Sequence, residues 1–163
     1  MFGAFAYVGA DLHQRFDLSF TMIGVCVGAF AIGGLIYSSF VRAFVSRLGP
    51  RGLAVGGGIM LFASYLTLTV TPVWWTAPVS VMGIGLGFYM FHNTLQTFAT
   101  QMTPSARGTA VSLFSAALYL GQTAGVATAA LIFDRLGGAP VFATAGILLL
   151  LVSIWVARAI ARR

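Results

Sequence analysis

The sequence contains no lysine and no glutamate, and only 7% of its 163 residues are charged. Soluble globular domains carry about 25% charged residues. A surface with so few charges cannot face water over most of its area, so most of it must face lipid. Hydrophobic residues make up 59% of the chain. The composition therefore predicts an integral membrane protein surrounded by the lipid bilayer.

Metal-ligating and nucleophilic residues are also scarce. The one cysteine, Cys26, lies inside an apolar run, where it is interpreted as a small apolar side chain. Intramembrane proteolysis needs a serine-histidine pair, an aspartate pair or a His-Glu-x-x-His motif. His92 has no nucleophilic serine in a glycine-flanked turn, and we expect no buried aspartate. We expect no enzyme activity, no catalytic residue, no metal site and no cofactor.

All nine basic residues are arginines, and they cluster at the ends of apolar runs. This placement is typical of residues that fix membrane topology, and it argues against a nucleic-acid partner. Only Arg15 and Arg135 fall on one side of the predicted membrane. The positive-inside rule then makes the opposite side, which includes the C-terminus, cytoplasmic. The arginines on that side are Arg42, Arg47, Arg51, Arg107, Arg158, Arg162 and Arg163.

Charged residues divide the chain into apolar segments. The uncharged stretch 52–106 is too long for one span of about 20–25 residues. It is divided at 71–75, where a proline precedes two tryptophans, because proline disrupts a helix and tryptophan favours the membrane interface. We predict one all-α domain over residues 1–163, with spans at 1–11, 18–42, 53–71, 76–99, 106–133 and 139–157.

The first of these spans is unusually short. Residues 1–11 supply about half of the ~20 residues that a crossing needs, and Asp11 ends the apolar run. We expect this segment to be the last part of a helix whose beginning is missing. The sequence leaves open whether Met1 is a natural start.

The polar residues Tyr89, His92, Asn93 and Gln96 are candidates for a substrate cavity. Their offsets of 3, 4 and 7 place all four on one helical face. Polar side chains in a span avoid lipid and point into the bundle or into a wet cavity. The alternative is hydrogen bonding between helices near the cytoplasmic end, which contributes about 0.6 kcal/mol per contact.

Two further sets of residues predict helix contacts. Ser115, Tyr119 and Gln122 share a face of the fifth span and are candidates for a helix interface. Small residues four apart allow helices to approach closely in lipid. Such pairs indicate either sliding surfaces or static packing; they are Gly24 and Gly28, Gly83 and Gly87, and Gly121 and Gly125.

The segment 46–51 resembles the basic cytoplasmic loop motif of the major facilitator superfamily, Asp-Arg-x-Gly-Arg-Arg. Arg47, Gly49 and Arg51 match this pattern, while the aspartate and the first arginine after the glycine are replaced. The stretches 104–108, 120–125 and 133–138 are also similar to family patterns, and their order covers nearly the whole chain.

The resemblance implies the C-terminal half of such a permease, from a partial seventh helix to the twelfth. It implies a six-helix bundle of inverted three-helix repeats whose tenth helix lines a central cavity and whose eleventh contacts the other half. Arg47 and Arg51 are then either topology anchors or latch residues between the halves. The partner is the missing N-terminal half or a second copy.

The expected function is transport of a small organic solute by alternating access. Export is favoured over sugar import, because the helices are rich in aromatic residues and carry no charge at mid-depth. The alternative is a non-transporting or regulatory membrane subunit that pairs with another helical bundle. We expect the inner membrane of a bacterium, with the C-terminus in the cytoplasm.

Overall fold

The computed structural model describes residues 1–102 and 104–162, and every regular element in these two ranges is a helix. This all-α architecture is the predicted fold class. The elements are α1 (Phe2–Phe5), α2 (Val8–Phe16), α3 (Phe20–Val70), η1 (Trp74–Thr76), α4 (Ala77–Met102), η2 (Pro104–Ala106), α5 (Arg107–Leu136) and α6 (Gly138–Ala161).

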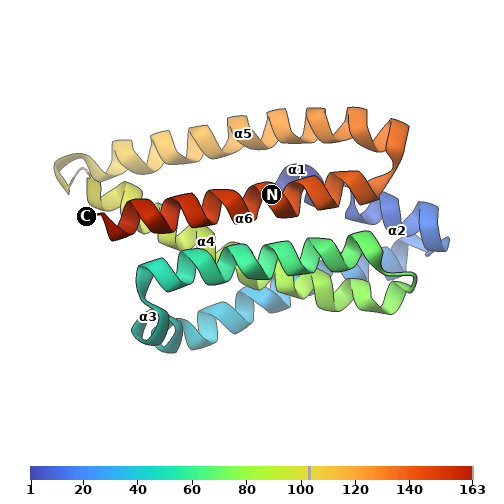
Figure 1. Ribbon diagram of the computed structural model, residues 1–163, viewed down its shortest axis with the longest axis horizontal. Helices are drawn as coiled ribbons and strands as arrows, with labels where there is room; N and C mark the ends of the chain where they lie inside the picture. The colour runs from blue at the N-terminus through green and yellow to red at the C-terminus, as the bar shows by residue number, and fades with distance from the viewer. Residues whose placement is uncertain (103, 163) are drawn as a thin grey trace.

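Helix α3 consists of two arms that meet at Gly49. Gly49 has φ 62° and ψ 178°, a backbone conformation that favours glycine. Pro50 follows, and its ring suits the first position of a new helix. We call residues 20–48 the first arm and residues 50–70 the second arm; Figure 1 shows them folding back on each other. The first arm thus continues beyond residue 42, and the expected basic loop is a tight turn.

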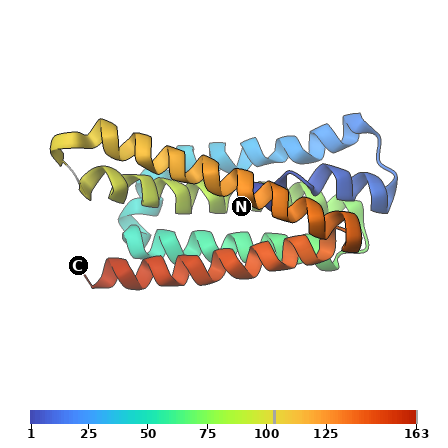
Figure 2. The same cartoon turned by 90° about the horizontal axis from the view of Figure 1, so that it is seen from above.

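The long helices lie side by side along a common axis (Figures 1 and 2). The break in α3, the beginning of α5 and the C-terminus lie at one end, which we call the arginine-rich end. Helix α2, the end of the second arm and the turn from α5 to α6 lie at the opposite end. The N-terminus lies about midway along the bundle. The arginines therefore separate between the two ends as the sequence predicts, while the cytoplasmic orientation stays a prediction.

Three of the described helices are long and apolar enough to cross a membrane, namely α3, α5 and α6. Helix α4 is not among them, although a span was expected at 76–99. Its second half carries His92, Asn93 and Gln96, and these polar side chains lower its hydropathy. The helix packs mainly against both arms of α3, which shields it from lipid.

Glycines bring α3 and α4 into backbone contact. A Cβ atom at Gly33 would meet the Met82 carbonyl oxygen, and one at Gly85 would meet the Phe30 carbonyl. Gly57 and Gly87 face each other, so that a Cβ on either would lie 2.8 Å from the carbonyl oxygen of the other. These positions tolerate no side chain unless the helices separate.

The three predicted glycine pairs differ in their surroundings. Gly83 and Gly87 pack against the second arm, as close packing requires. Around Gly24, Gly28 and Gly121, in contrast, a Cβ atom would find no other described atom within 4 Å. Close packing inside this chain therefore explains the α4 pair but not the glycines on the first arm or Gly121.

The first predicted helix extends further than expected. It breaks between α1 and α2, and α2 then continues through Asp11 to Phe16. The sequence predicts no buried aspartate, and this is wrong, because only 3% of the surface of Asp11 is exposed. The helix can continue because Arg15, one turn later, holds the buried carboxylate at 3.2 Å.

The Asp11–Arg15 pair joins three helix ends. The guanidinium of Arg15 donates to the Leu68 carbonyl at 2.9 Å and to the Thr71 carbonyl, both at the end of α3. The Asp11 carboxylate lies against Gly138, the first residue of α6. Positive charge is favourable at a helix C-terminus and negative charge at an N-terminus. Each charge of the pair thus faces the helix end that it complements.

Replacing Arg15 by alanine should destabilise the bundle. Arg15→Ala removes the partner of a buried carboxylate and two charge-assisted hydrogen bonds. We expect the free energy of unfolding to fall by about 2 kcal/mol, a value reduced because the Arg15 side chain is 31% exposed. Unfolding in detergent micelles, followed by far-UV circular dichroism, measures this. Arg135→Ala, at an exposed arginine of the same end, is the control; equal losses in both variants would refute the role of the pair.

The glycine contacts make a second prediction about stability. Gly87→Ala should lower the free energy of unfolding by about 1–3 kcal/mol, because the added methyl group meets backbone atoms of Gly57. Gly28→Ala is the matched control, since nothing lies within 4 Å of its added methyl group. The same unfolding measurement compares the two variants. A Gly28 variant as unstable as the Gly87 variant would contradict the packing described here.

Candidate functional site

Nine aromatic rings form a continuous row across four helices, which we call the aromatic strip. Neighbouring ring centroids lie 4.8–6.4 Å apart. Such separations are typical of stacked and edge-to-face aromatic pairs. The members are Phe2 and Phe5 of α1, Phe30, Tyr37 and Phe44 of α3, Phe88, Tyr89 and His92 of α4, and Phe114 of α5.

The spacing of the residues explains why the strip forms. Phe30, Tyr37 and Phe44 are seven residues apart, so they share one face of the first arm. Helix α4 presents Tyr89 to this face, and the Tyr89 ring lies against Gly34, where a larger residue would collide with it. Tyr37 is buried, whereas the other eight rings are half-buried. The strip therefore combines firm packing with partly exposed ring surfaces.

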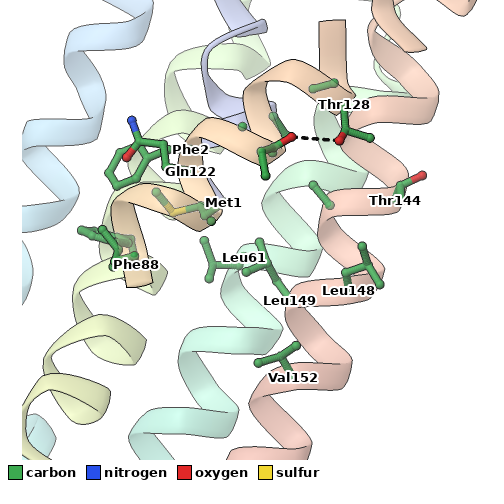
Figure 3. A pocket seen from close by; sticks show the side chains of 18 of the residues that line it. Met1, Phe2, Leu61, Phe88, Gln122, Thr128, Thr144, Leu148, Leu149 and Val152 are labelled. Carbon is green, nitrogen blue, oxygen red and sulfur yellow. Dashed lines mark hydrogen bonds between the residues drawn. The ribbon is translucent and has the colours of Figure 1, made fainter. Parts of the chain in front are cut away.

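A pocket of about 600 Å³ opens where the strip reaches α5, and we call it the central pocket (Figure 3). Residues of α1, α4, α5, α6 and the second arm line it, and most of them are apolar. Its side-chain polar groups come from His92, Gln122, Thr128 and Thr144. The Thr128 hydroxyl already donates to the Ala124 carbonyl at 2.8 Å. An apolar cavity of this size with few polar groups is typical of small-molecule sites.

A second pocket of about 530 Å³ lies between both arms of α3 and the last turns of α4. We call it the end pocket, because Pro50 at the arginine-rich end lines it. Its polar lining carries no formal charge and consists of amides and hydroxyls. These groups belong to Tyr37, Asn93, Thr94, Gln96, Thr97, Thr100 and Gln101.

The comparison with known proteins decides the family. A sequence model described as Major Facilitator Superfamily matches residues 1–163. The chain belongs to the major facilitator superfamily. Members of this superfamily are carriers embedded in the lipid bilayer, so the aromatic strip and both pockets lie in a membrane protein.

Several individual relatives are transporters by name. An uncharacterized MFS-type transporter of Bacillus subtilis is 25% identical over 137 residues, covering 82% of this chain and 34% of the relative. Another from the same organism is 32% identical over 95 residues, covering 58% and 24%. A D-xylose transporter of Levilactobacillus brevis is 24% identical over 111 residues, covering 68% and 24%. The matched region thus spans between a quarter and a third of these relatives. No solved structure matches the chain.

Three of the four cavity candidates of this facilitator-superfamily chain line one of two pockets, and the fourth lines neither. His92 lines the central pocket and stacks on Phe88 at 4.8 Å, while Asn93 and Gln96 line the end pocket. Tyr89 lines neither pocket and stacks on Tyr37 at 6.4 Å. In the described ranges, no side-chain hydrogen bond to another helix is recorded for these four residues.

The three interface candidates also separate. Gln122 lines the central pocket together with His92, so α4 and α5 each contribute one polar side chain to it. Tyr119 is 64% exposed on α5 and Ser115 is half-buried, and neither residue lines the two pockets. The family resemblance favoured packing over substrate contact for all three residues and did not connect Gln122 with His92.

The loop motif of the superfamily coincides with the break in α3. Gly49 supplies the turn, and Arg47 and Arg51 are exposed on either side of it. Over residues 1–102 and 104–162, the one recorded ion pair is Arg15 with Asp11. A latch formed by Arg47 or Arg51 therefore has no acidic partner within these ranges.

Two features of the site were missed in the sequence. The seven-residue spacing of Phe30, Tyr37 and Phe44 was a detectable signal for an aromatic face. The meeting of His92 and Gln122 was not detectable, since it depends on how α4 and α5 cross. No cluster of three potential metal ligands occurs in the part of the chain that the structure describes.

Cysteine accessibility tests whether the end pocket holds water. In a Cys26→Ala background, Asn93→Cys should react with a charged, membrane-impermeant thiol reagent applied from the arginine-rich side, because Asn93 lines an open polar pocket. Met90→Cys, one helical turn away and 4% exposed, should react much more slowly. Mass spectrometry measures both rates. Equally slow reaction at the two positions would favour packing over a wet cavity.

Proposed function

We propose that this chain takes part in the transport of a small organic solute by alternating access, as the C-terminal half of a facilitator-superfamily permease. The central pocket is the observation that carries the proposal. It holds His92 of α4 and Gln122 of α5 among apolar side chains, and residues of α1, the second arm and α6 complete its lining. A solute bound there contacts five helical segments at once.

A second bundle completes the transporter in this proposal. Only 11% of the apolar window in α5 is buried within the chain, against 28% in α3 and 22% in α6. Helix α5 thus offers the largest uncovered surface for a partner, which includes Tyr119. The open glycines Gly24 and Gly28 of the first arm allow a second close helix contact. The partner is the N-terminal half or a second copy of this chain.

The remaining details of the proposal concern direction and placement. The aromatic strip and the absence of charge around it favour a solute with apolar surface over a sugar. On this ground we favour export over sugar import. The D-xylose transporter among the relatives instead supports a sugar as the solute, so the transport experiment includes this sugar. The bacterial relatives support the inner membrane, and the arginine distribution supports a cytoplasmic C-terminus. In this arrangement the exposed Arg47 and Arg51 face acidic groups or helix ends of the partner bundle.

Transport should require two bundles. We expect the native assembly, detected with an antibody to the C-terminal residues, to have at least about twice the 17.2 kDa mass of this chain. This assembly, purified and reconstituted in liposomes, should move a radiolabelled neutral organic solute such as 1-naphthol. His92→Leu should slow this flux by roughly three- to tenfold, the effect of losing one hydrogen-bonding group.

The controls separate transport from other roles. Trp155→Leu changes a 70% exposed residue of α6 outside both pockets and should leave the flux unchanged. D-xylose flux that exceeds naphthol flux would overturn the assignment of a solute with apolar surface. An assembly that binds its partner bundle but moves neither solute would contradict transport and indicate a regulatory subunit.

A further inference from the structure

We propose that the aromatic strip is a stacking surface for an uncharged, planar solute, and that it leads this solute between the central pocket and the end pocket. This inference rests on the proposed transport function and names the class of solute. The strip reaches both pockets: Phe2, Phe88 and His92 line the central pocket, and Tyr37 lines the end pocket. Tyr89 and Phe30 connect these rings between the pockets.

The ring orientations favour stacking of a flat molecule. His92 and Phe88 are nearly parallel, with 23° between their planes, and so are Tyr37 and Tyr89, with 21°. The rings of Phe88 and Tyr89 are instead at 72° to each other, so the strip turns between the two stacks. All these rings except Tyr37 are half-buried, so each keeps part of its surface uncovered. Each stacked aromatic pair stabilises a bound ring beyond the burial of its apolar surface.

The distribution of charge selects an uncharged solute. Asp11 is engaged by Arg15, and the remaining acidic residues, Asp17 and Asp134, are exposed near the same end as this pair. No described carboxylate is therefore near the strip to neutralise a cation. Ring faces attract cations, but removing a charge from water at mid-depth in a bilayer costs several kcal/mol without a partner.

The polar groups beside the strip are suited to a neutral compound. His92 and Gln122 in the central pocket, and Asn93 and Gln96 in the end pocket, can each bind a hydroxyl, carbonyl or ring nitrogen. A planar compound with one or two such groups would stack on the rings and form a hydrogen bond at either end of the strip. A sugar would offer many hydroxyls to a surface that is mainly carbon.

Photolabelling tests this assignment. The chain is placed in nanodiscs with a neutral naphthyl diazirine, irradiated, and mapped by peptide mass spectrometry. Adducts should concentrate on residues 88–92 and should be displaced by 1-naphthol but not by equal concentrations of D-xylose or of a naphthyl trimethylammonium cation. Phe88→Leu with His92→Leu should lower the saturable labelling roughly tenfold, since two stacking partners are lost.

Controls distinguish binding from solubility of the probe in lipid. Labelling of residues 20–25 in the first arm, where Phe20, Met22 and Val25 are exposed outside both pockets, gives the non-saturable background, and Trp155→Leu should not change labelling of the strip. Far-UV circular dichroism verifies that each variant is folded. Displacement of the label from residues 88–92 by the cation or by D-xylose would overturn the assignment to planar neutral solutes. The same result would still show that this face binds a solute, so the transport proposal would stand. If labelling follows lipid exposure alone and none of the three compounds displaces it, binding at the strip is contradicted.

Discussion

Close backbone contact between α3 and α4 is the constraint on which the rest of the bundle depends. In lipid, no hydrophobic force drives helices together, so association relies on packing and on a few polar contacts. The glycines at 33, 57, 85 and 87 permit this packing because they place no side chain between the two helices. The same approach sets the aromatic strip: the Tyr89 ring reaches Tyr37 only because Gly34 beneath it has no side chain. Stability and site geometry therefore share one set of contacts.

Charge is arranged so that almost none is buried in the described part of the bundle. The buried carboxylate of Asp11 is the exception. Its negative charge is paired with the Arg15 guanidinium and lies against the N-terminus of α6 at Gly138. Arg15 in turn donates to carbonyls at the end of α3. Removing a charge from water is costly unless it is paired and hydrogen-bonded. The pair thus closes one end of the bundle, while the exposed arginines remain at the other end in contact with solvent.

Much of the fold could be predicted from the sequence, because apolar runs and their interruptions follow directly from the requirements of the bilayer. The break at Gly49–Pro50 and the turn near Pro72 illustrate this. The continuation of α2 through Asp11 could not be predicted, since it depends on carbonyls that are more than 50 residues away in the chain. Likewise, helical periodicity predicts one shared face for four polar residues of α4, namely Tyr89, His92, Asn93 and Gln96. That face meets the first arm on one side and α5 on the other. Periodicity along one helix cannot reveal which neighbour each side chain faces.

The attachment of α5 explains why the central pocket lies where it does. Its buried residues, Ala129 and Phe133, are both in its second half, where the Tyr7 hydroxyl also donates to the Val126 carbonyl at 3.3 Å. In its first half, Gly108 and Gly121 face open space, and the link from the aromatic strip is the contact of Phe114 with His92 at 5.4 Å. Helix α5 is therefore held near one end and loosely attached toward the arginine-rich end. Of the α5 residues that line the central pocket, Leu118, Gly121 and Gln122 belong to the loosely attached part and Thr128, Ala129 and Ile132 to the held part, so the pocket lies where the attachment of α5 changes.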